Sequence, residues 1–348
     1  MTLSAQKAVM RHRRPSTASA SRWRLPSKYI PLIATAVVVI TLYLTGCFAY
    51  RNFFRLSVAM NLLRGDVYLG VAAIGATFVI LSGGIDLSVG GLAACLAVFI
   101  AKMVAERGMP PAQAIALTLL LGCLFGAAQG CIIHFYKQPA FLVTLAGMFL
   151  ARGVGFIMSA EPINLAHHPF YRTTISNLAI PLGVTNMPFS ILCYGVIFAV
   201  ALFVAHQTKF GRAVHAIGDD EPSAQLMGLS VGRTKILVYT LAGLLSALAA
   251  VIYTFERSAG DPSDLVGFEL DAIAAVVIGG TLLSGGVGFV AGTALGVLTL
   301  GLIQKHVISL SLNTWWTKIA VGLLMLLFIG IQNIVVALSR RGGRSAVS

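Results

Sequence analysis

Long apolar stretches without charged side chains are the feature of this sequence that most restricts its fold. Residues 30–50, 112–133, 187–205 and 236–255 contain no Asp, Glu, Lys or Arg. Each is close to the roughly 20 residues with which a helix crosses a bilayer. Only 11% of all residues are charged, against roughly 25% in soluble domains. The chain is therefore expected to be an all-α integral membrane protein, because a helix bonds its own backbone groups in lipid.

Two further apolar stretches are too long for one membrane helix and too short for two. Residues 67–101 contain a single charge, that of Asp86, and residues 272–304 contain none. As continuous helices they would be about 50 Å long, whereas the hydrocarbon core is roughly 30 Å thick. Each is therefore predicted to form two short or broken helices. With one segment at residues 140–158 and a last one ending at Leu338, the sequence predicts ten membrane segments and both termini on one side.

The tetrapeptide Leu-Ser-Gly-Gly stands at the predicted break of each long stretch. It occupies residues 81–84 and, 202 residues later, residues 283–286, which suggests two related halves. Paired glycines release backbone groups from a helix, and in a membrane these groups line a cavity or bind other parts of the protein. We therefore predict that the following residues shape a substrate path: Gly83, Gly84, Ser284, Gly285 and Gly286. The alternative is that the glycines only permit close helix packing.

Asp86 follows the first glycine pair. An ionisable side chain at membrane depth indicates a functional site, but Asp86 or Ser88 is also suited to cap the helix that follows, and Asp271 to cap a later one. We favour the cap and keep Asp86 and Ser88 as candidates for the path. An intramembrane aspartyl protease is disfavoured, because such enzymes carry Gly-x-Gly-Asp and this chain has Gly-Gly-Ile-Asp.

The loop at residues 207–235 is long enough to dock a partner. Asp219 or Asp220 is suited to cap a helix, and Pro222 to occupy its first turn. A short helix is therefore predicted over residues 223–229. Its small and apolar side chains favour docking to a cytosolic protein, and a solvated connector is the alternative.

Basic residues near the two ends predict the orientation. The net charge is +13, and Lys and Arg are frequent in both terminal segments. This distribution is typical of cytoplasmic tails and not of a nucleic-acid-binding surface. We expect cytoplasmic tails at residues 1–29 and 339–348, with a membrane domain over residues 30–338. Residues 51–65 are expected to form a short interfacial helix on the other side.

Motifs for catalysis and nucleotide binding are absent from the sequence. It has no Gly-x4-Gly-Lys-Ser/Thr phosphate loop, no His-Glu-x-x-His and no Gly-x-Ser-x-Gly. His167 and His168 are adjacent, so their rings tend to point apart, which disfavours a metal site. No cofactor and no enzymatic activity are predicted.

The chain resembles the ABC permeases for ribose, xylose and arabinose in three places. Their most characteristic stretch is similar to residues 78–90, FVILSGGIDLSVG. Residues 138–145 are similar to their Gln-Pro-Phe-Ile-Ala-Thr-Leu segment, with Ala140 inserted before Phe141. Their cytoplasmic loop that contacts the ATPase is similar around Gly211, Ala216, Gly218, Ala224 and Gly228, although Asp219-Asp220 replaces Gly-Asn or Asn-Glu. The resemblance covers about residues 30–335.

Within this family, residues 268–288 and 315–320 are similar to the permeases of galactofuranose importers. The resemblance implies an importer in the bacterial inner membrane. Its further parts would be a periplasmic sugar-binding protein, a second and different permease chain, and a cytosolic ABC ATPase that hydrolyses ATP. Phe141 and Thr144 are additional candidates for the path of the monosaccharide.

The polar residues of the membrane segments suit a neutral sugar. They are mainly Ser, Thr, Asn and Gln, which offer hydroxyl and amide partners. The near absence of buried charge disfavours coupling to protons or sodium ions. The alternatives are a ribose or xylose permease, an ion-coupled sugar carrier and a membrane enzyme. Trp315 and Trp316 fit an interfacial aromatic belt, with stacking on a sugar as the alternative.

Overall fold

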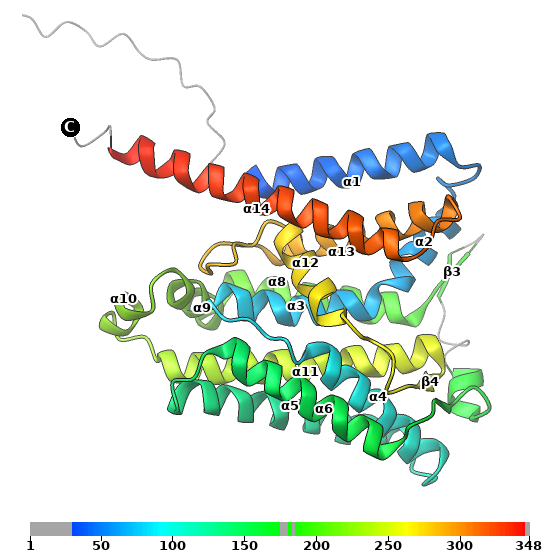
Figure 1. Ribbon diagram of the computed structural model, residues 1–348. Coiled ribbons are helices and arrows are strands. Elements are labelled where there is room, and N and C mark those ends of the chain that lie inside the picture. The colour runs from blue at the N-terminus through cyan, green and yellow to red at the C-terminus, as the bar shows by residue number, and fades with distance from the viewer. Residues whose placement is uncertain (1–29, 175–179, 183–184, 345–348) are drawn as a thin grey trace, which may run out of the picture.

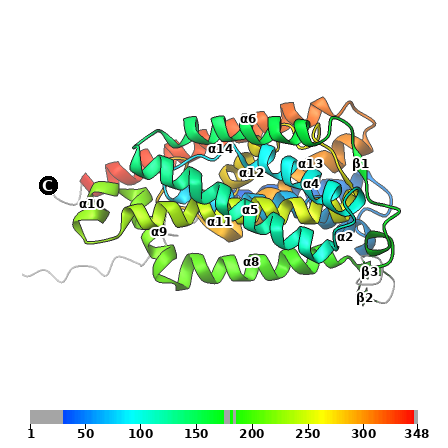
Figure 2. The same cartoon turned by 90° about the horizontal axis from the view of Figure 1, so that it is seen from below.

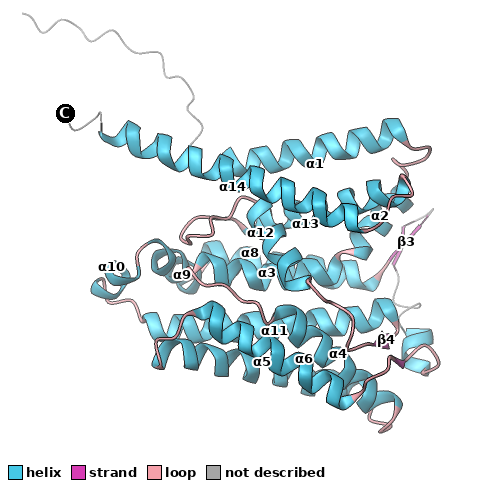
Figure 3. Ribbon diagram, in the orientation of Figure 1, coloured by secondary structure: helices cyan, strands magenta, loops and turns pink. Residues whose placement is uncertain are grey.

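The computed structural model describes residues 30–174, 180–182 and 185–344, which form a bundle of helices with two pairs of short antiparallel strands (Figures 1 and 3). The predicted tail at residues 1–29 lies outside the described residues, as do residues 345–348. In chain order the elements are α1 (Ile30–Ala49), α2 (Leu56–Gly65), α3 (Val67–Leu81), α4 (Val89–Ala105), α5 (Pro111–Phe135), α6 (Ala140–Met158), β1 (Ile163–Asn164), the π-helix η2 (Phe170–Thr174), β2 (Ile180–Leu182), β3 (Thr185–Met187), α8 (Phe189–Gln207), α9 (Lys209–Asp219), α10 (Glu221–Leu226), α11 (Val231–Arg257), β4 (Ala259–Gly260), α12 (Phe268–Ile278), α13 (Val290–Ser309) and α14 (Trp315–Arg344).

The described helices confirm an all-α membrane protein. Seven of them are long and apolar enough to cross a bilayer, and the number is eight if α2 and α3, which meet at 52°, form one span. Helix α4 has 17 residues and α12 has 11, fewer than the roughly 20 of a complete span. The predicted total of ten membrane segments is therefore not confirmed.

Both long apolar stretches are broken, as the sequence predicts. The first break separates α3 from α4, and the second separates α12 from α13. Helix α3 ends at Leu81, Gly83 follows at a φ of 81°, and the amide of Gly84 donates to the carbonyl of Val79 at 3.0 Å. This is the Schellman turn, in which a residue without a Cβ atom adopts the left-handed conformation.

The second break has the same turn. Helix α12 ends at Ile278, Gly280 follows at a φ of 92°, and the amide of Thr281 donates to the carbonyl of Val276 at 3.2 Å. The second Leu-Ser-Gly-Gly lies within this break, between α12 and α13, as predicted. Gly285 and Gly286 are also at positive φ there. The repeated tetrapeptide marks equivalent loops, and an earlier glycine pair ends the second helix.

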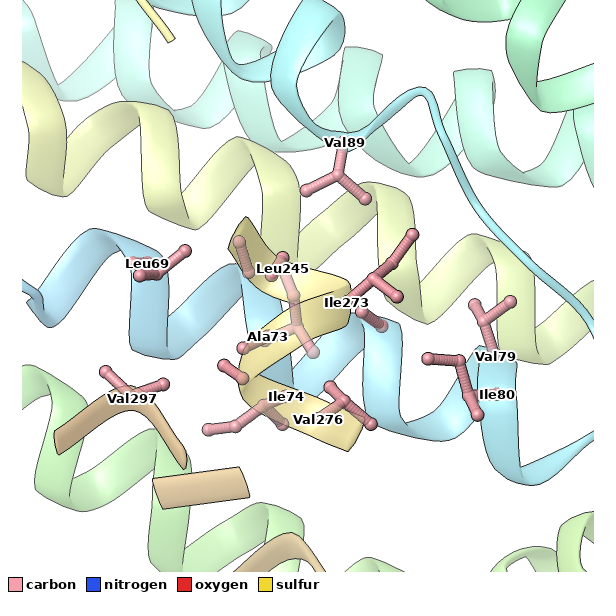
Figure 4. Packing of buried hydrophobic residues seen from close by; sticks show 14 of the residues in the cluster. Leu69, Ala73, Ile74, Val79, Ile80, Val89, Leu245, Ile273, Val276 and Val297 are labelled. Carbon is pink, nitrogen blue, oxygen red and sulfur yellow. The ribbon is translucent and has the colours of Figure 1, made fainter. Parts of the chain in front are cut away.

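The two broken helices occupy the middle of the bundle. Figure 1 shows α1 and α14 on one side and α5 and α6 on the other, with α3, α11 and α12 between them. Helix α11 packs against α3, α4 and α5, while α12 packs against α3 and α13. Figure 4 shows Ile74, Leu245, Ile273 and Val297 from four helices in this core. Side chains of neighbouring helices therefore surround α3 and α12, the helices that precede the two breaks.

Glycines bring α5 and α11 into backbone contact. Gly122, Gly126 and Gly130 are each four residues apart on α5 and so lie on one face of the helix. A Cβ atom at Gly126 would lie 2.1 Å from the backbone oxygen of Tyr239, and one at Gly243 would lie 2.2 Å from that of Gly122. Small residues permit such close approach between membrane helices. Here glycine serves helix packing, the role considered as an alternative for the glycines at the breaks.

The buried end of α12 is bonded by side chains from the outer helices. Thr35 of α1 donates to the carbonyl of Ile278, and Gln332 of α14 donates to that of Val277 at 3.1 Å. The last carbonyls of a helix have no partner within it, and leaving one buried and unbonded costs about 1–3 kcal/mol. Helices α1 and α14 therefore stabilise the second break.

Arg152 of α6 fixes the loop between α11 and α12. Its guanidinium donates to the backbone oxygens of Pro262 at 3.0 Å, Asp264 at 2.6 Å and Leu265 at 3.0 Å. The Tyr253 hydroxyl donates to the carboxylate of Asp264. The charge of Arg152 thus has a structural role within its apolar helix.

Figure 2 shows the molecule from below, with α9 and α10 at one end and the short strands at the other.

The predicted loop at residues 207–235 contains two helices instead of one. Helix α9 (Lys209–Asp219) is not predicted, and α10 (Glu221–Leu226) begins and ends earlier than the predicted helix over residues 223–229. Asp220 is the cap, since its carboxylate accepts the amide of Ser223 at 2.9 Å. Of the two predicted caps, Asp219 and Asp220, the structure confirms Asp220.

Two other expectations need correction. Helix α2 begins at Leu56, so only the second part of the helix predicted over residues 51–65 is found. Helix α12 begins with Gly267 at its N-cap, and the predicted cap Asp271 lies inside the helix and pairs with a lysine instead. Helix α14 continues to Arg344, and the end of the membrane domain at residue 338 stays a prediction.

Candidate functional site

A cavity of about 940 Å³ opens at the end of the bundle that carries α9 and α10. Parts of both break loops line it, together with the end of α5, the loop before α6, helices α9 and α10, and the first turns of α11. The predicted residues that line it are Gly83, Gly84 and Ser284 from the path set and Gly218 from the docking set. The two groups of residues, predicted separately, therefore meet at one cavity.

The two break loops are joined by a backbone hydrogen bond beside this cavity. The amide of Gly286 donates to the carbonyl of Leu81 at 3.0 Å. Gly218, near the end of α9, lies directly against this bond. A Cβ atom at Gly218 would lie 1.8 Å from the Leu81 oxygen and 2.6 Å from the Gly286 nitrogen. We call Leu81, Gly218 and Gly286 the break junction, because α9 contacts both broken stretches there.

Helices α9 and α10 are fixed to the bundle by caps and by an ion pair. Thr208 caps α9 by accepting the amide of Gly211 at 3.1 Å. Glu221 of α10 pairs with Lys235 of α11 at 2.7 Å. A movement of this surface is therefore expected to reach the break junction through α9.

The predicted docking residues do not all face outward. Gly211 and Ala224 are buried, Ala216 is half-buried and Gly228 is exposed at a φ of 82° just after α10. Ala224 packs with Ile217 and Val231 inside the loop. The large apolar side chains that project outward are Leu226 and Met227, which are 89% and 70% exposed. Gly211, Ala216 and Ala224 therefore shape this surface from within.

Asp86 lies in a buried polar cluster and not in the cavity lining. It is 4% exposed, and one carboxylate oxygen accepts the Ser88 amide at 2.8 Å and the Ser88 hydroxyl at 2.7 Å. Helix α4 begins after Ser88, whose side chain makes no cap bond. The cap interpretation is therefore wrong in its detail: Asp86 closes a turn ahead of the helix. The Ser88 hydroxyl also lies 3.2 Å from Oε1 of Gln129 on α5.

Thr144 ties α6 to the extended segment of the first break. Its hydroxyl accepts the amide of Leu87 at 3.1 Å and lies 3.2 Å from the carbonyl of Ile85. Phe141, one turn earlier, is 47% exposed. Neither predicted side chain lines the cavity, and neither do Gly285 and Gly286. The roles of all these residues in transport stay predictions.

Tyr239 of α11 is a candidate that sequence reasoning missed. It lines the cavity, is 2% exposed and has a hydroxyl without a hydrogen-bond partner among the described residues. It faces the first break, since a Cβ atom at Gly84 would lie 2.3 Å from this hydroxyl. A buried polar group without a partner is costly and calls for an explanation. The sequence does not single it out, because residues 236–255 contain four other hydroxyl side chains, those of Thr240, Ser246, Tyr253 and Thr254.

Ionisable side chains stand around part of the cavity. His134, Lys137 and the Glu221–Lys235 pair stand around it. Among the residues that the structure describes, no group of three or more His, Cys, Asp or Glu could hold a metal ion. A helical membrane bundle with two glycine-broken stretches, and with a cavity beside them, defines a membrane permease.

Comparisons with known proteins agree with this class. Residues 58–329 match the family described as branched-chain amino acid transport system / permease component, and the chain belongs to this family. It is thus a permease component and not a catalytic subunit.

Relatives align along most of their length. The inner membrane ABC transporter permease protein YjfF of Escherichia coli K12 is 46% identical over 87% of this chain and 92% of its own length. The fructose import permease protein FruG of Bifidobacterium longum is 34% identical over 92% and 98%. The ribose import permease protein RbsC of Escherichia coli K12 is 36% identical over 81% and 87%.

Proposed function

We propose that this chain is a permease subunit of an ATP-driven ABC importer for a monosaccharide. Relatives over most of the chain are named as ABC, ribose or fructose import permeases. The observation that carries the proposal is the break junction, where Gly218 of α9 contacts both broken stretches. A subunit without its own phosphate-binding loop needs such a contact to receive movement from outside.

The proposed partners follow from this arrangement. A cytosolic ABC ATPase binds the surface formed by α9 and α10, with Leu226 and Met227 as its exposed apolar contacts. The loop and both termini then face the cytoplasm of a bacterial cell, and the opposite end receives sugar from a periplasmic binding protein. A second, different permease chain completes the pathway.

The cavity is suited to a sugar that has passed the first break. Its volume lies near the upper end of the roughly 300–1,000 Å³ typical of small-molecule pockets. The free Tyr239 hydroxyl and the backbone at Gly83 and Gly84 offer hydrogen bonds to sugar hydroxyls. When the ATPase moves α9, the break junction and the cavity mouth change together.

We propose galactofuranose as the sugar. The support is the similarity of residues 268–288 and 315–320 to the permeases of galactofuranose importers. Uptake of a labelled galactofuranoside should be inhibited less than twofold by a hundredfold excess of ribose, xylose or fructose. Strong inhibition by one of these would assign the permease to that sugar instead.

Reconstitution tests the proposed function. Proteoliposomes with this chain, its co-purified partner proteins and a binding protein should accumulate sugar only with ATP inside the compartment that the ATPase faces. Vesicles with this chain alone should show no accumulation, with or without a proton or sodium gradient. Gradient-driven accumulation by the chain alone would contradict the proposal and favour an ion-coupled carrier.

Removal of the Tyr239 hydroxyl gives a second test. Tyr239→Phe should lower sugar uptake up to about tenfold, since one lost hydrogen bond is worth about 1.4 kcal/mol at most. The thermal stability of the purified protein should not fall, because the hydroxyl has no partner to lose among the described residues. Tyr194→Phe, at a tyrosine on α8 outside the cavity lining, is the control. Unchanged uptake in Tyr239→Phe would remove this residue from the path.

A further inference from the structure

A second cavity of about 440 Å³ lies at the end of the bundle opposite α9 and α10. It is formed where α3 begins, α13 ends and α14 begins, beside the first half of α12. Figure 1 shows α2 and the start of α14 at this end. The cavity shares no lining residue with the one at the break junction, so it is a separate site.

Two carboxylates face this cavity in different states. Asp271 of α12 is held by Lys318 of α14, whose Nζ lies 2.7 Å from each carboxylate oxygen. Asp66, between α2 and α3, makes no side-chain hydrogen bond or ion pair to the residues that the structure describes. It is only partly exposed, and a Cβ atom at Gly301 would lie 1.9 Å from its Oδ2. A partly buried carboxylate without a partner favours a ligand that donates hydrogen bonds.

Amide groups and an aromatic ring complete the lining. Gln304 of α13 and Asn313, which precedes α14, both line the cavity. Asn313 uses its carbonyl oxygen to accept the amide of Trp315 at 3.1 Å, which leaves its NH₂ group as a donor. The ring of Trp315 is 73% exposed at the first position of α14. Such a ring offers a flat apolar face beside polar groups.

The charges of the site select a neutral ligand. Lys318 is the only Lys or Arg among the lining residues and already pairs with Asp271, which leaves no such cation to bind a phosphorylated or acidic sugar. The described residues contain no group of three or more metal-ligating side chains, and Lys318 already occupies the Asp271 carboxylate. A metal ion is therefore disfavoured. Hydroxyl groups suit the free Asp66 carboxylate, and the C–H face of a sugar ring suits Trp315.

We propose that this cavity is a second binding site, in which Asp66 and Trp315 hold a neutral monosaccharide. The inference rests on the proposed function for its choice of ligand. The Asp66 carboxylate accepts hydroxyl hydrogens, the Asn313 and Gln304 amides donate to hydroxyl oxygens, and the Trp315 ring stacks on the sugar. Lys318 keeps Asp271 in position at the edge of the site.

Equilibrium dialysis of the purified full-length chain tests the site without ATP or partner proteins. The probes are radiolabelled D-ribose and methyl β-D-galactofuranoside, and unlabelled ribose 5-phosphate is the competitor. We expect saturable binding of at least one neutral probe, at least tenfold weaker binding in Asp66→Asn and Trp315→Phe, and no competition by the phosphate. Trp316→Phe is the matched control, because Trp316 is the neighbouring tryptophan and does not line the cavity.

The outcomes separate this site from the proposed function. Unchanged affinity in Asp66→Asn and Trp315→Phe, with both variants monodisperse and as thermally stable as the parent chain, would overturn the site. Absence of binding of either probe to the chain would overturn it too. In either case, ATP-driven uptake by the reconstituted importer would still support the proposed transport function.

Discussion

Gly218→Val is expected to abolish ATP-driven sugar uptake while leaving the chain in the membrane. The Cβ atom of any new side chain would begin 1.8 Å from the Leu81 oxygen and 2.6 Å from the Gly286 nitrogen. Valine must therefore separate α9 from the two break loops, and overpacking of this kind costs about 1–3 kcal/mol. Since about 1.4 kcal/mol is a tenfold change in an equilibrium, we expect uptake to fall at least about fivefold. Uptake in proteoliposomes and the amount of inserted protein are the measurements.

Gly195→Val on α8 is the matched control, because a Cβ atom there meets nothing within 4 Å. It should transport at the rate of the parent chain. Gly218→Ala should already reduce uptake, since the steric conflict begins at the Cβ atom. Normal uptake in Gly218→Val would show that the break junction does not transmit movement.

Gly126→Leu should prevent stable folding of the bundle. Its Cβ atom would lie 2.1 Å from the backbone oxygen of Tyr239, and neither backbone can move aside without separating α5 from α11. Helix α11 is the most buried of the long helices, so this separation disrupts the centre of the molecule. We expect destabilisation of at least about 3 kcal/mol, the upper end of overpacking costs. Thermal unfolding in detergent and yield of monodisperse protein measure it.

Gly153→Leu on α6 is the control for this change. A Cβ atom at Gly153 meets nothing within 4 Å, so leucine there extends into open space. Its unfolding temperature should stay within a few degrees of the parent value. Equal stability of the Gly126 and Gly153 variants would mean that α5 and α11 are not in close backbone contact.

Apolar length and glycine chemistry allowed much of the fold to be predicted. A stretch such as residues 67–101 exceeds one span, so a break near Gly83 follows from length alone. The second Leu-Ser-Gly-Gly also lies in its break, whereas the exact end of α12, before Gly279 and Gly280, depends on packing. Gly279 and Gly280 end the helix since the carbonyls there find Thr35 and Gln332. These partners lie more than 50 residues away in the chain.

Three glycines that line the candidate cavity were predicted from the sequence, whereas the side chain of Tyr239 was not. Gly83, Gly84 and Gly218 carry local signals, and they do meet at the cavity. Tyr239 does not stand out in an apolar helix, and its free hydroxyl becomes visible only when its surroundings are known. Helix α9 was missed since its residues are polar and glycine-containing, which in an isolated sequence is typical of a connector. Thr208 caps it, and contacts with α8 and α11 hold it.

The hydrogen bond between Gly286 and Leu81 uses only main-chain atoms. No substitution of the Leu81 side chain can remove its acceptor, and only proline would remove the donor at position 286. The two break loops can therefore exchange most of their side chains during evolution without losing the link between them. What must be preserved is the lack of a side chain at Gly218, because the backbone of the two break loops fills the space that a Cβ atom would need.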